Sequence, residues 1–213
     1  MDTDAQHTQP TERDRAPAPE KGSGRRSRSV RLAAGTAVVA GALLLANAFV
    51  VQPFRIPSDS MADTLRTGDR ALVNKLAYRF GNLPRRGDVV VFDGTGSFDR
   101  EPADGTDYVK RVVGVGGDRV TCCDGRGRIE VNGEPVDERY LYPGERPSAV
   151  PFDIEVPQGR LWMMGDRRSR SRDSRDHLGA PGGGTVPVDR VIGRVDWIIW
   201  PARHWTSLRD HHG

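Results

Sequence analysis

Two serines that stand two positions apart, Ser58 and Ser60, are the residues of this chain best suited to nucleophilic chemistry. A serine hydroxyl is a weak nucleophile unless a base removes its proton, and the oxyanion that forms on attack needs hydrogen-bond donors. Ser60 can attack while Ser58 donates. A Pro-Ser-x-Ser segment by itself more often marks a loop or a helix cap, so this pair gains meaning only if the chain also supplies a base.

Lys110 is the candidate for that base. Lysine is scarce, since it occurs only as Lys21, Lys75 and Lys110, and arginine cannot lose its proton in a protein. Strand alternation over residues 108–113 puts Lys110 on the same face as Tyr108 and puts Arg111 on the opposite face. Burial would lower the lysine pKa from about 10.4 by as much as roughly 3–5 units. A solvent-facing lysine is the simpler alternative, and Arg111 is expected to pair with a carboxylate.

A third motif, residues 165–175, has the composition of a basic segment that binds nucleic acid. It directly follows the apolar residues 161–164 and is interleaved with Asp166, Asp173 and, just beyond it, Asp176. This interleaving favours an ordered loop with internal ion pairs over a basic tail. In such a loop a hydroxyl such as that of Ser171 can hold a neutral lysine amine by hydrogen bonding. We therefore expect no nucleic-acid partner.

The elements that position these residues follow an uncharged stretch at residues 32–51. At 1.5 Å per residue, a helix of this length spans a hydrocarbon core of roughly 30 Å. The formal charge of the chain is only +3, and an arginine cluster precedes the stretch. The positive-inside rule then puts the N-terminus in the cytoplasm and the rest outside. The alternative is a cleavable signal peptide that ends at the A-x-A-like residues 46–48.

The chain is expected to divide into three parts: a disordered cytoplasmic tail at residues 1–29, a transmembrane helix at 30–51 and an extracytoplasmic domain at 52–213. The tail is rich in proline and charged residues, which disfavours folding. The domain is predicted to be mainly β, an antiparallel sheet with a β-rich cap inserted at residues 119–158. The predicted strands cover residues 71–75, 88–92, 108–115, 119–121, 128–131, 160–164 and 191–200. A hairpin turn is expected at Asn132-Gly133.

The only two cysteines, Cys122 and Cys123, are adjacent in sequence. This spacing fits neither a zinc site nor a CxxC redox pair. Either two free thiols or a disulfide between neighbours is compatible with the sequence, and we assign these cysteines no function.

Together the three motifs resemble bacterial-type signal peptidase I, the Ser-Lys membrane peptidase that removes signal peptides from exported proteins. Residues 54–61 with Thr64-Leu65 resemble its nucleophile box, and residues 87–92 resemble the strand that follows. Residues 108–111 with 114–118 resemble its lysine box, and residues 165–175 its last box. The four segments occur in the family's order, and the resemblance covers roughly residues 30–200. Two departures from the family's pattern matter: Asp63 stands where the similar proteins usually have proline, and Arg167 stands where they usually have asparagine.

The resemblance implies a role for each matched residue. Ser60 would be the nucleophile and Lys110 the general base, with the Ser60 amide and the Ser58 hydroxyl as oxyanion donors. Ser171 would orient Lys110, and Asp173 and Arg175 would form a supporting ion pair. The residues that resemble the pocket for small side chains of the substrate are Phe54, Ile56, Pro57, Met61, Leu65, Tyr108 and Val109.

The implied activity is cleavage after A-x-A sequences through an acyl-enzyme, with no metal or cofactor. The expected partners are signal peptides of exported preproteins and the lipid bilayer, and the expected state is a monomer in the cell membrane. One competing hypothesis is a serine hydrolase that uses His177 near Asp173. Another is a membrane-tethered β-domain that binds partners without catalysis. Self-cleaving repressor-type peptidases share the Ser-Lys chemistry, but they lack a membrane span and usually carry a DNA-binding module.

Overall fold

A computed structural model describes residues 23–99 and 106–209, without the side chains of residues 23–29 and 46–49. The chain divides after Leu43 into two compact units. The disordered tail predicted for residues 1–29 lies largely outside the described residues. Where the description begins, at Ser23, the chain is already helical.

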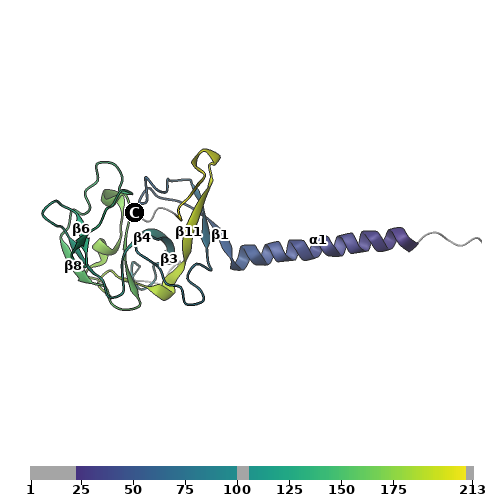
Figure 1. Ribbon diagram of the computed structural model, residues 1–213, viewed down its shortest axis with the longest axis horizontal. Coiled ribbons are helices and arrows are strands. Elements are labelled where there is room, and N and C mark those ends of the chain that lie inside the picture. Colours follow the sequence, from purple (N-terminus) through teal and green to yellow (C-terminus); the bar gives the residue numbers. More distant parts are fainter. Residues whose placement is uncertain (1–22, 100–105, 210–213) are drawn as a thin grey trace, which may run out of the picture. The chain divides into compact units, whose positions relative to one another are not determined.

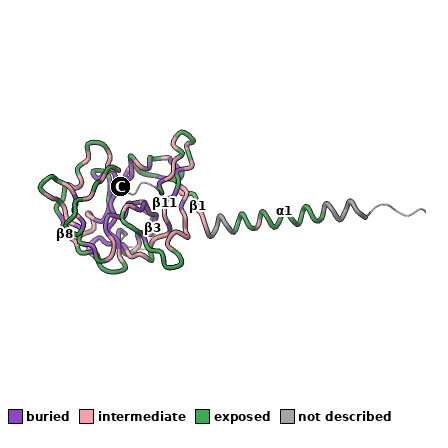
Figure 2. The backbone as a smooth tube through the Cα atoms, in the orientation of Figure 1, coloured by how far each residue is buried: buried purple, intermediate pink, exposed green. Residues whose placement is uncertain are grey.

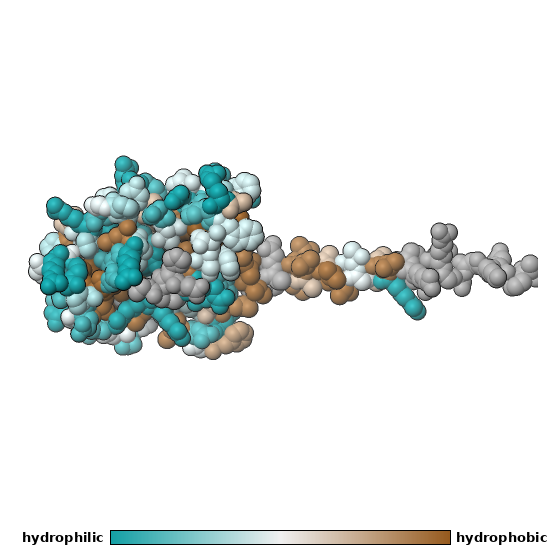
Figure 3. All heavy atoms as spheres, turned by 45° about the horizontal axis from the view of Figure 1, so that its top comes forward, coloured by the Kyte–Doolittle hydropathy of each residue, from teal (hydrophilic) through white to brown (hydrophobic). Residues whose placement is uncertain are grey.

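Helix α1 (Ser23–Phe49) covers most of the segment predicted to cross a membrane. The helical conformation agrees with the high helix propensity of alanine and leucine. Its described apolar side chains, such as Leu32 and Val38, are exposed, and Figure 3 shows apolar surface along the helix. Among the described residues, however, no helix combines the length and the apolarity needed to cross a membrane. The structure therefore does not confirm the predicted span over residues 30–51.

The second unit is built on an antiparallel eight-stranded sheet in the order β1-β2-β11-β3-β4-β9-β10, with β12 paired to β11 (Figure 1). Its strands are β1 (Val51–Arg55), β2 (Arg70–Asn74), β3 (Val89–Asp93), β4 (Asp107–Val115), β9 (Arg160–Met164), β10 (Val186–Pro187), β11 (Val191–Trp200) and β12 (Thr206–Ser207). The mainly β, antiparallel fold expected from the sequence is confirmed.

A smaller four-stranded sheet lies within residues 119–158, the segment predicted as an insertion. Its order is β7-β6-β5-β8, and its strands are β5 (Arg119–Cys122), β6 (Ile129–Val131), β7 (Glu134–Pro135) and β8 (Phe152–Glu155). The predicted hairpin turn joins β6 to β7: Asn132 and Gly133 have φ of 58° and 81°. Positive φ at both central residues is the requirement of a type I′ turn, which asparagine and glycine meet most easily.

The core forms on both faces of the larger sheet because side chains alternate along each strand. Val89 and Val91 of the central strand β3 belong to one apolar cluster, and Val90 and Phe92 to another. A third cluster joins the two sheets, with Val120 from β5 packed in the same group as Trp162 from β9. Figure 2 shows buried backbone in the middle of this unit and exposed loops around it.

Four short 3-10 helices complete the described structure: η1 (Arg168–Arg170), η2 (Ser174–His177), η3 (Val188–Arg190) and η4 (Ala202–His204). The first two lie in the loop after β9, where the sequence predicted an ordered, internally paired segment.

All seven predicted strands correspond to strands of the structure, but five short ones were missed. The longest of these, β1, reads VQPFR, which lacks an alternating pattern and contains Pro53. Proline is tolerated there because β1 is an edge strand, as the sheet order shows. Strand β8 is paired along its length with β5. This pairing is a long-range contact, so the four residues of β8 do not predict the strand on their own.

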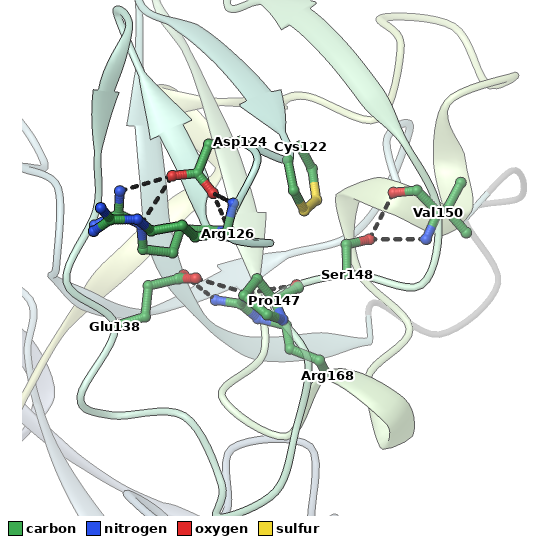
Figure 4. Close-up of a disulfide and its surroundings, with 10 residues drawn as sticks. Cys122, Asp124, Arg126, Glu138, Pro147, Ser148, Val150 and Arg168 are labelled. Carbon is green, nitrogen blue, oxygen red and sulfur yellow. Dashed lines mark hydrogen bonds and ion pairs between the residues drawn. A yellow bond between two sulfur atoms is a disulfide. The ribbon is translucent and has the colours of Figure 1, made fainter.

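Cys122 and Cys123 form a disulfide at the end of β5 (Figure 4). The structure thus selects one of the two states that the sequence left open. The bond lies in the smaller sheet, where Cys122 pairs with Phe152 of β8.

Candidate active site

Ser60 lies in the loop that connects β1 to β2. Backbone hydrogen bonds close this loop at its base: Ile56 N–H donates to the Asp69 carbonyl at 2.9 Å, and Gly68 N–H donates to the Ile56 carbonyl at 2.9 Å. The Asp69 carboxylate accepts the Arg66 amide at 2.8 Å. These bonds hold the loop in a defined shape, and Ser60 is buried within it at 6% exposure.

Lys110 comes from the middle of β4, opposite Val90 of β3, and is 4% exposed. Its Nζ donates to Ser60 Oγ at 2.9 Å. Burial lowers the pKa of Lys110 to about 8, while the negative charges of Asp173 and Asp166 act in the opposite direction. A lysine with such a pKa is neutral in roughly a tenth of the molecules at pH 7, far more often than an exposed lysine. It also lies within hydrogen-bond reach of the hydroxyl that it would deprotonate. Lys110 is therefore buried, and the alternative of a solvent-facing lysine is wrong.

Ser58 lies in the same loop and is exposed. Its Oγ is 3.3 Å from Ser60 Oγ. The Ser60 hydroxyl thus lies within hydrogen-bond distance of both the lysine amine and a second hydroxyl.

Ser171 does not make the hydrogen bond to Lys110 that was expected of it. The residue is buried, but its Oγ has no hydrogen-bond partner among the described residues. Instead, the Ser171 hydroxyl and the Ser60 carbonyl oxygen both pack against the Cα of Gly165. A side chain at Gly165 would collide with both, so this glycine is what allows β9 to end so close to the nucleophile.

Asp173 and Arg175 form the expected ion pair, with Arg175 Nε 2.8 Å from Asp173 Oδ1. Asp173 also accepts the Gly165 amide at 3.0 Å and caps η2 by accepting the Arg175 amide. The carboxylate therefore connects the end of β9 to the helix that follows it.

Arg111, the neighbour of Lys110, pairs with a carboxylate as expected, and that carboxylate belongs to Asp166. The two form a bidentate pair, with Nε to Oδ1 at 2.8 Å and Nη2 to Oδ2 at 2.7 Å, and both side chains are almost fully buried. Thr64 donates to Asp166 at 2.5 Å. Because Thr64 is in the nucleophile loop, the cluster fixes that loop to β4, which carries the lysine.

Two further ion pairs at the site were not predicted. Arg167 pairs with Asp59 at 2.7 Å, and the buried Arg168 pairs with Glu138 at 2.5 Å (Figure 4). The alternating charges of residues 165–176 indicated internal pairing. They did not reveal that these partners come from distant loops, because the partners are separated from them by 108 and 30 residues.

The structure brings together most of the predicted pocket residues but not all. Ile56, Met61 and Leu65 are buried in one apolar cluster, and Phe54 and Val109 pack against it. Pro57 is exposed. Tyr108 packs instead with the cluster on the other face of the sheet, where its hydroxyl donates to Asp99 at 2.8 Å. Alternation along β4 explains the division, since Tyr108 and Val109 point to opposite faces.

His177, the base of the competing hydrolase hypothesis, stacks on Phe98 with ring centres 4.5 Å apart. Burial and the nearby Arg172 lower the pKa of His177. Among the described residues, the hydrogen-bond partners of the Ser60 hydroxyl are Lys110 and Ser58. The arrangement favours lysine over histidine as the partner of the serine.

A buried serine hydroxyl hydrogen-bonded to a lysine of lowered pKa, on an antiparallel β fold, is the arrangement of a serine peptidase. The family model described as "Signal peptidase, peptidase S26" matches residues 29–200. The chain therefore belongs to the signal peptidase family, peptidase S26, and is a hydrolase of the serine peptidase class.

Curated relatives agree with this assignment. The chain is 39% identical over 205 residues to the signal peptidase I of Mycobacterium tuberculosis, which covers 76% of this chain and 69% of that protein. It is 37% identical over 210 residues to a probable signal peptidase I of Mycobacterium leprae, which covers 75% and 72%. It is 33% identical over 175 residues to signal peptidase IB of Staphylococcus aureus, which covers 75% and 83%.

Among solved structures, a crystal structure of a signal peptidase I from Enterococcus faecalis is similar at 26% identity, with a TM-score of 0.39. The match covers 53% of this chain and 96% of that one.

Proposed function

We propose that this chain removes the N-terminal signal peptides of exported preproteins by acyl transfer through Ser60, with Lys110 as general base. The observation that carries the proposal is the 2.9 Å hydrogen bond between Lys110 Nζ and Ser60 Oγ. The lowered pKa of Lys110 supports the same roles, because it raises the fraction of the amine that is neutral and able to accept a proton.

In the proposed reaction, the neutral Lys110 amine accepts the Ser60 proton as Oγ attacks the carbonyl carbon of the scissile bond. The Ser60 amide and the Ser58 hydroxyl donate to the oxyanion of the tetrahedral intermediate. The Lys110 ammonium then protonates the leaving amine, the C–N bond breaks, and the acyl-enzyme remains. Water activated by the neutral Lys110 hydrolyses the ester and restores Ser60.

The preference for small residues before the cleavage site is proposed from the family resemblance. Three of the expected pocket residues, Ile56, Met61 and Leu65, are buried in one apolar cluster, and Phe54 and Val109 pack against it. An apolar lining of this kind suits small apolar side chains of a substrate, which is consistent with A-x-A sequences.

The membrane anchor is likewise a proposal. The chain is tethered by residues 32–51, with the N-terminus in the cytoplasm and the peptidase unit on the outer face. Support comes from the uncharged stretch and the arginines that precede it. Tethering would raise the effective concentration of substrates whose own apolar segments lie in the same membrane. Protease protection of the full chain in sealed vesicles of known orientation tests this topology.

Cleavage of a preprotein with an A-x-A site by the full chain in detergent tests the activity, and mass spectrometry of the new N-terminus tests the specificity. Ser60→Ala and Lys110→Ala are each expected to abolish cleavage. Full activity in either variant would exclude the Ser60–Lys110 pair. Failure of the wild-type chain to cut any signal peptide would instead favour the hypothesis of a binding domain without catalysis.

A further inference from the structure

An ion pair next to the nucleophile has no part in the proposed acyl transfer. Arg167 Nη1 donates to Asp59 Oδ2 at 2.7 Å, and Asp59 stands between Ser58 and Ser60 in the sequence. The backbone amide of Arg167 also donates to the carbonyl oxygen of Ser60 at 3.1 Å. Arg167 therefore holds the nucleophile loop at two points, one through its side chain and one through its backbone.

Tyr142 contacts the same guanidinium. The Arg167 guanidinium lies 4.6 Å from the centre of the Tyr142 ring, a distance at which a cation and an aromatic face attract each other. The Tyr142 amide donates to the Asp166 carbonyl at 3.1 Å. Since Tyr142 belongs to the 119–158 segment, Arg167 connects that segment to the nucleophile loop.

The residues that follow Arg167 also bind the 119–158 segment. Arg168 donates to the Pro147 carbonyl at 2.6 Å and to Glu138 at 2.5 Å, and Figure 4 shows these three residues converging. The Ser169 amide donates to Glu145 at 2.9 Å. The 165–170 loop is thus fixed to residues 138–147 on both sides of the contact with Tyr142, so the Arg167 side chain is presented from a supported backbone.

We propose that Arg167 is a positioning residue that, through Asp59, holds Ser58 and Ser60 in the orientation needed for proton transfer to Lys110. The inference rests on the proposed peptidase function. It explains why this chain can carry a cation where the family usually has asparagine: Asp59 supplies the counter-charge and Tyr142 the stacking surface.

We expect loss of the Arg167–Asp59 ion pair to affect catalysis rather than stability. The Arg167 and Asp59 side chains are 25% and 42% exposed, and ion pairs of that exposure contribute little to folding. A displacement of about 1 Å at a reacting atom, in contrast, can lower a rate by about a hundredfold. Breaking the pair should therefore lower kcat while leaving the unfolding midpoint unchanged.

The experiment measures kcat, KM and the urea midpoint of the full chain in detergent with a signal-peptide substrate. It begins with wild type, which must cleave, and Ser60→Ala, which must not; failure at that step is a failure of the proposed function. Arg167→Gln is then expected to lower kcat about tenfold with KM within about twofold. Asp59→Asn should cause the same loss, and the double variant should be no worse than either single one. Arg167→Lys, which keeps the charge, should recover much of the rate.

Two matched controls isolate the contacts. Tyr142→Phe keeps the ring and should retain kcat, whereas Tyr142→Leu removes the ring and should lower it. Arg66→Gln breaks another exposed ion pair of the same loop, that with Asp63 at 3.1 Å, and should leave kcat unchanged.

Three results would overturn the inference while the wild-type chain remains active. The first is a wild-type kcat in Arg167→Gln. The second is additive losses in the double variant, which would mean that the two residues act separately. The third is a lower rate that follows a lower urea midpoint and is not recovered by lysine, which would mean a purely structural role.

Discussion

Replacement of Lys110 by methionine tests whether the fold holds this amine at an energetic cost. Burial lowers the pKa of Lys110 from 10.5 to about 8. Each pH unit of such a difference corresponds to about 1.4 kcal/mol. Below pH 8 the buried lysine therefore costs the folded protein about 3 kcal/mol relative to the unfolded chain, in which the ammonium is fully hydrated.

The sign of the pH dependence follows from proton binding. Between pH 8 and 10.5 the unfolded chain binds more protons at this lysine than the folded protein does, so wild-type stability rises with pH relative to the variant. Methionine has a similar length and volume and no charge. We expect Lys110→Met to be more stable than wild type by about 3 kcal/mol at pH 7, and the gain to vanish as the pH approaches 10.5.

Urea denaturation of the full chain in detergent, followed by tryptophan fluorescence at several pH values, measures this difference. Lys75→Met, at a partly exposed lysine of the same unit, controls for the loss of one positive charge. A Lys110→Met protein that is less stable than wild type at pH 7 would refute the reasoning. So would a stability difference that stays constant from pH 7 to 10.5.

Four other predictions follow from the same geometry. The wild-type kcat/KM should rise with pH through about 8 as the Lys110 ammonium loses its proton; a rise centred near 6.5 in the pH–rate profile would point to histidine instead. Gly165→Ala should lower peptidase activity by about a hundredfold, because the added Cβ would collide with the backbone carbonyl of Ser60; a near-normal kcat would contradict this. Arg111→Met should lower the free energy of unfolding by about 3–5 kcal/mol, since it leaves a buried carboxylate without its cation, and a urea titration that gives less than about 1 kcal/mol would argue against burial of the pair. His177→Gln should keep full cleavage activity, because this ring stacks on Phe98, whereas among the described residues the hydrogen bonds of the Ser60 hydroxyl go to Lys110 and Ser58; loss of cleavage would revive the histidine hypothesis.

The strands with a clear pattern were predictable, and those defined by their neighbours were not. Strand β3 reads VVVFD and is buried at four consecutive positions, which a continuous apolar run indicates directly. Strands β10 and β12 have two residues each and exist only because they pair with β9 and β11. A pattern in the local sequence cannot predict pairing of that kind.

The candidate active site was also predictable only in part. Residue types made Ser60 and Lys110 candidates for a nucleophile and a deprotonatable amine, and the resemblance of the ordered motifs to signal peptidase I singled them out. The sequence also implied that Arg111 needs a carboxylate partner. It did not identify Asp166 as that partner, because 55 residues separate the two and only the β4–β9 pairing brings them together.

By itself, the sequence determined the β character of the domain and the Asn132-Gly133 turn, since both depend on residue type and local spacing. It also supplied the motifs whose resemblance to a family points to Ser60 and Lys110 as the reactive groups. Tertiary structure decided which groups meet and in what environment. The Lys110 pKa is low because the folded chain buries the amine, which contacts Ser60 of the distant nucleophile loop, and no segment of the chain does this alone. Tertiary structure likewise decided the contacts of Ser171, whose hydroxyl packs against Gly165 instead of bonding to the lysine. It also decided the partners of Arg167, which come from two distant loops.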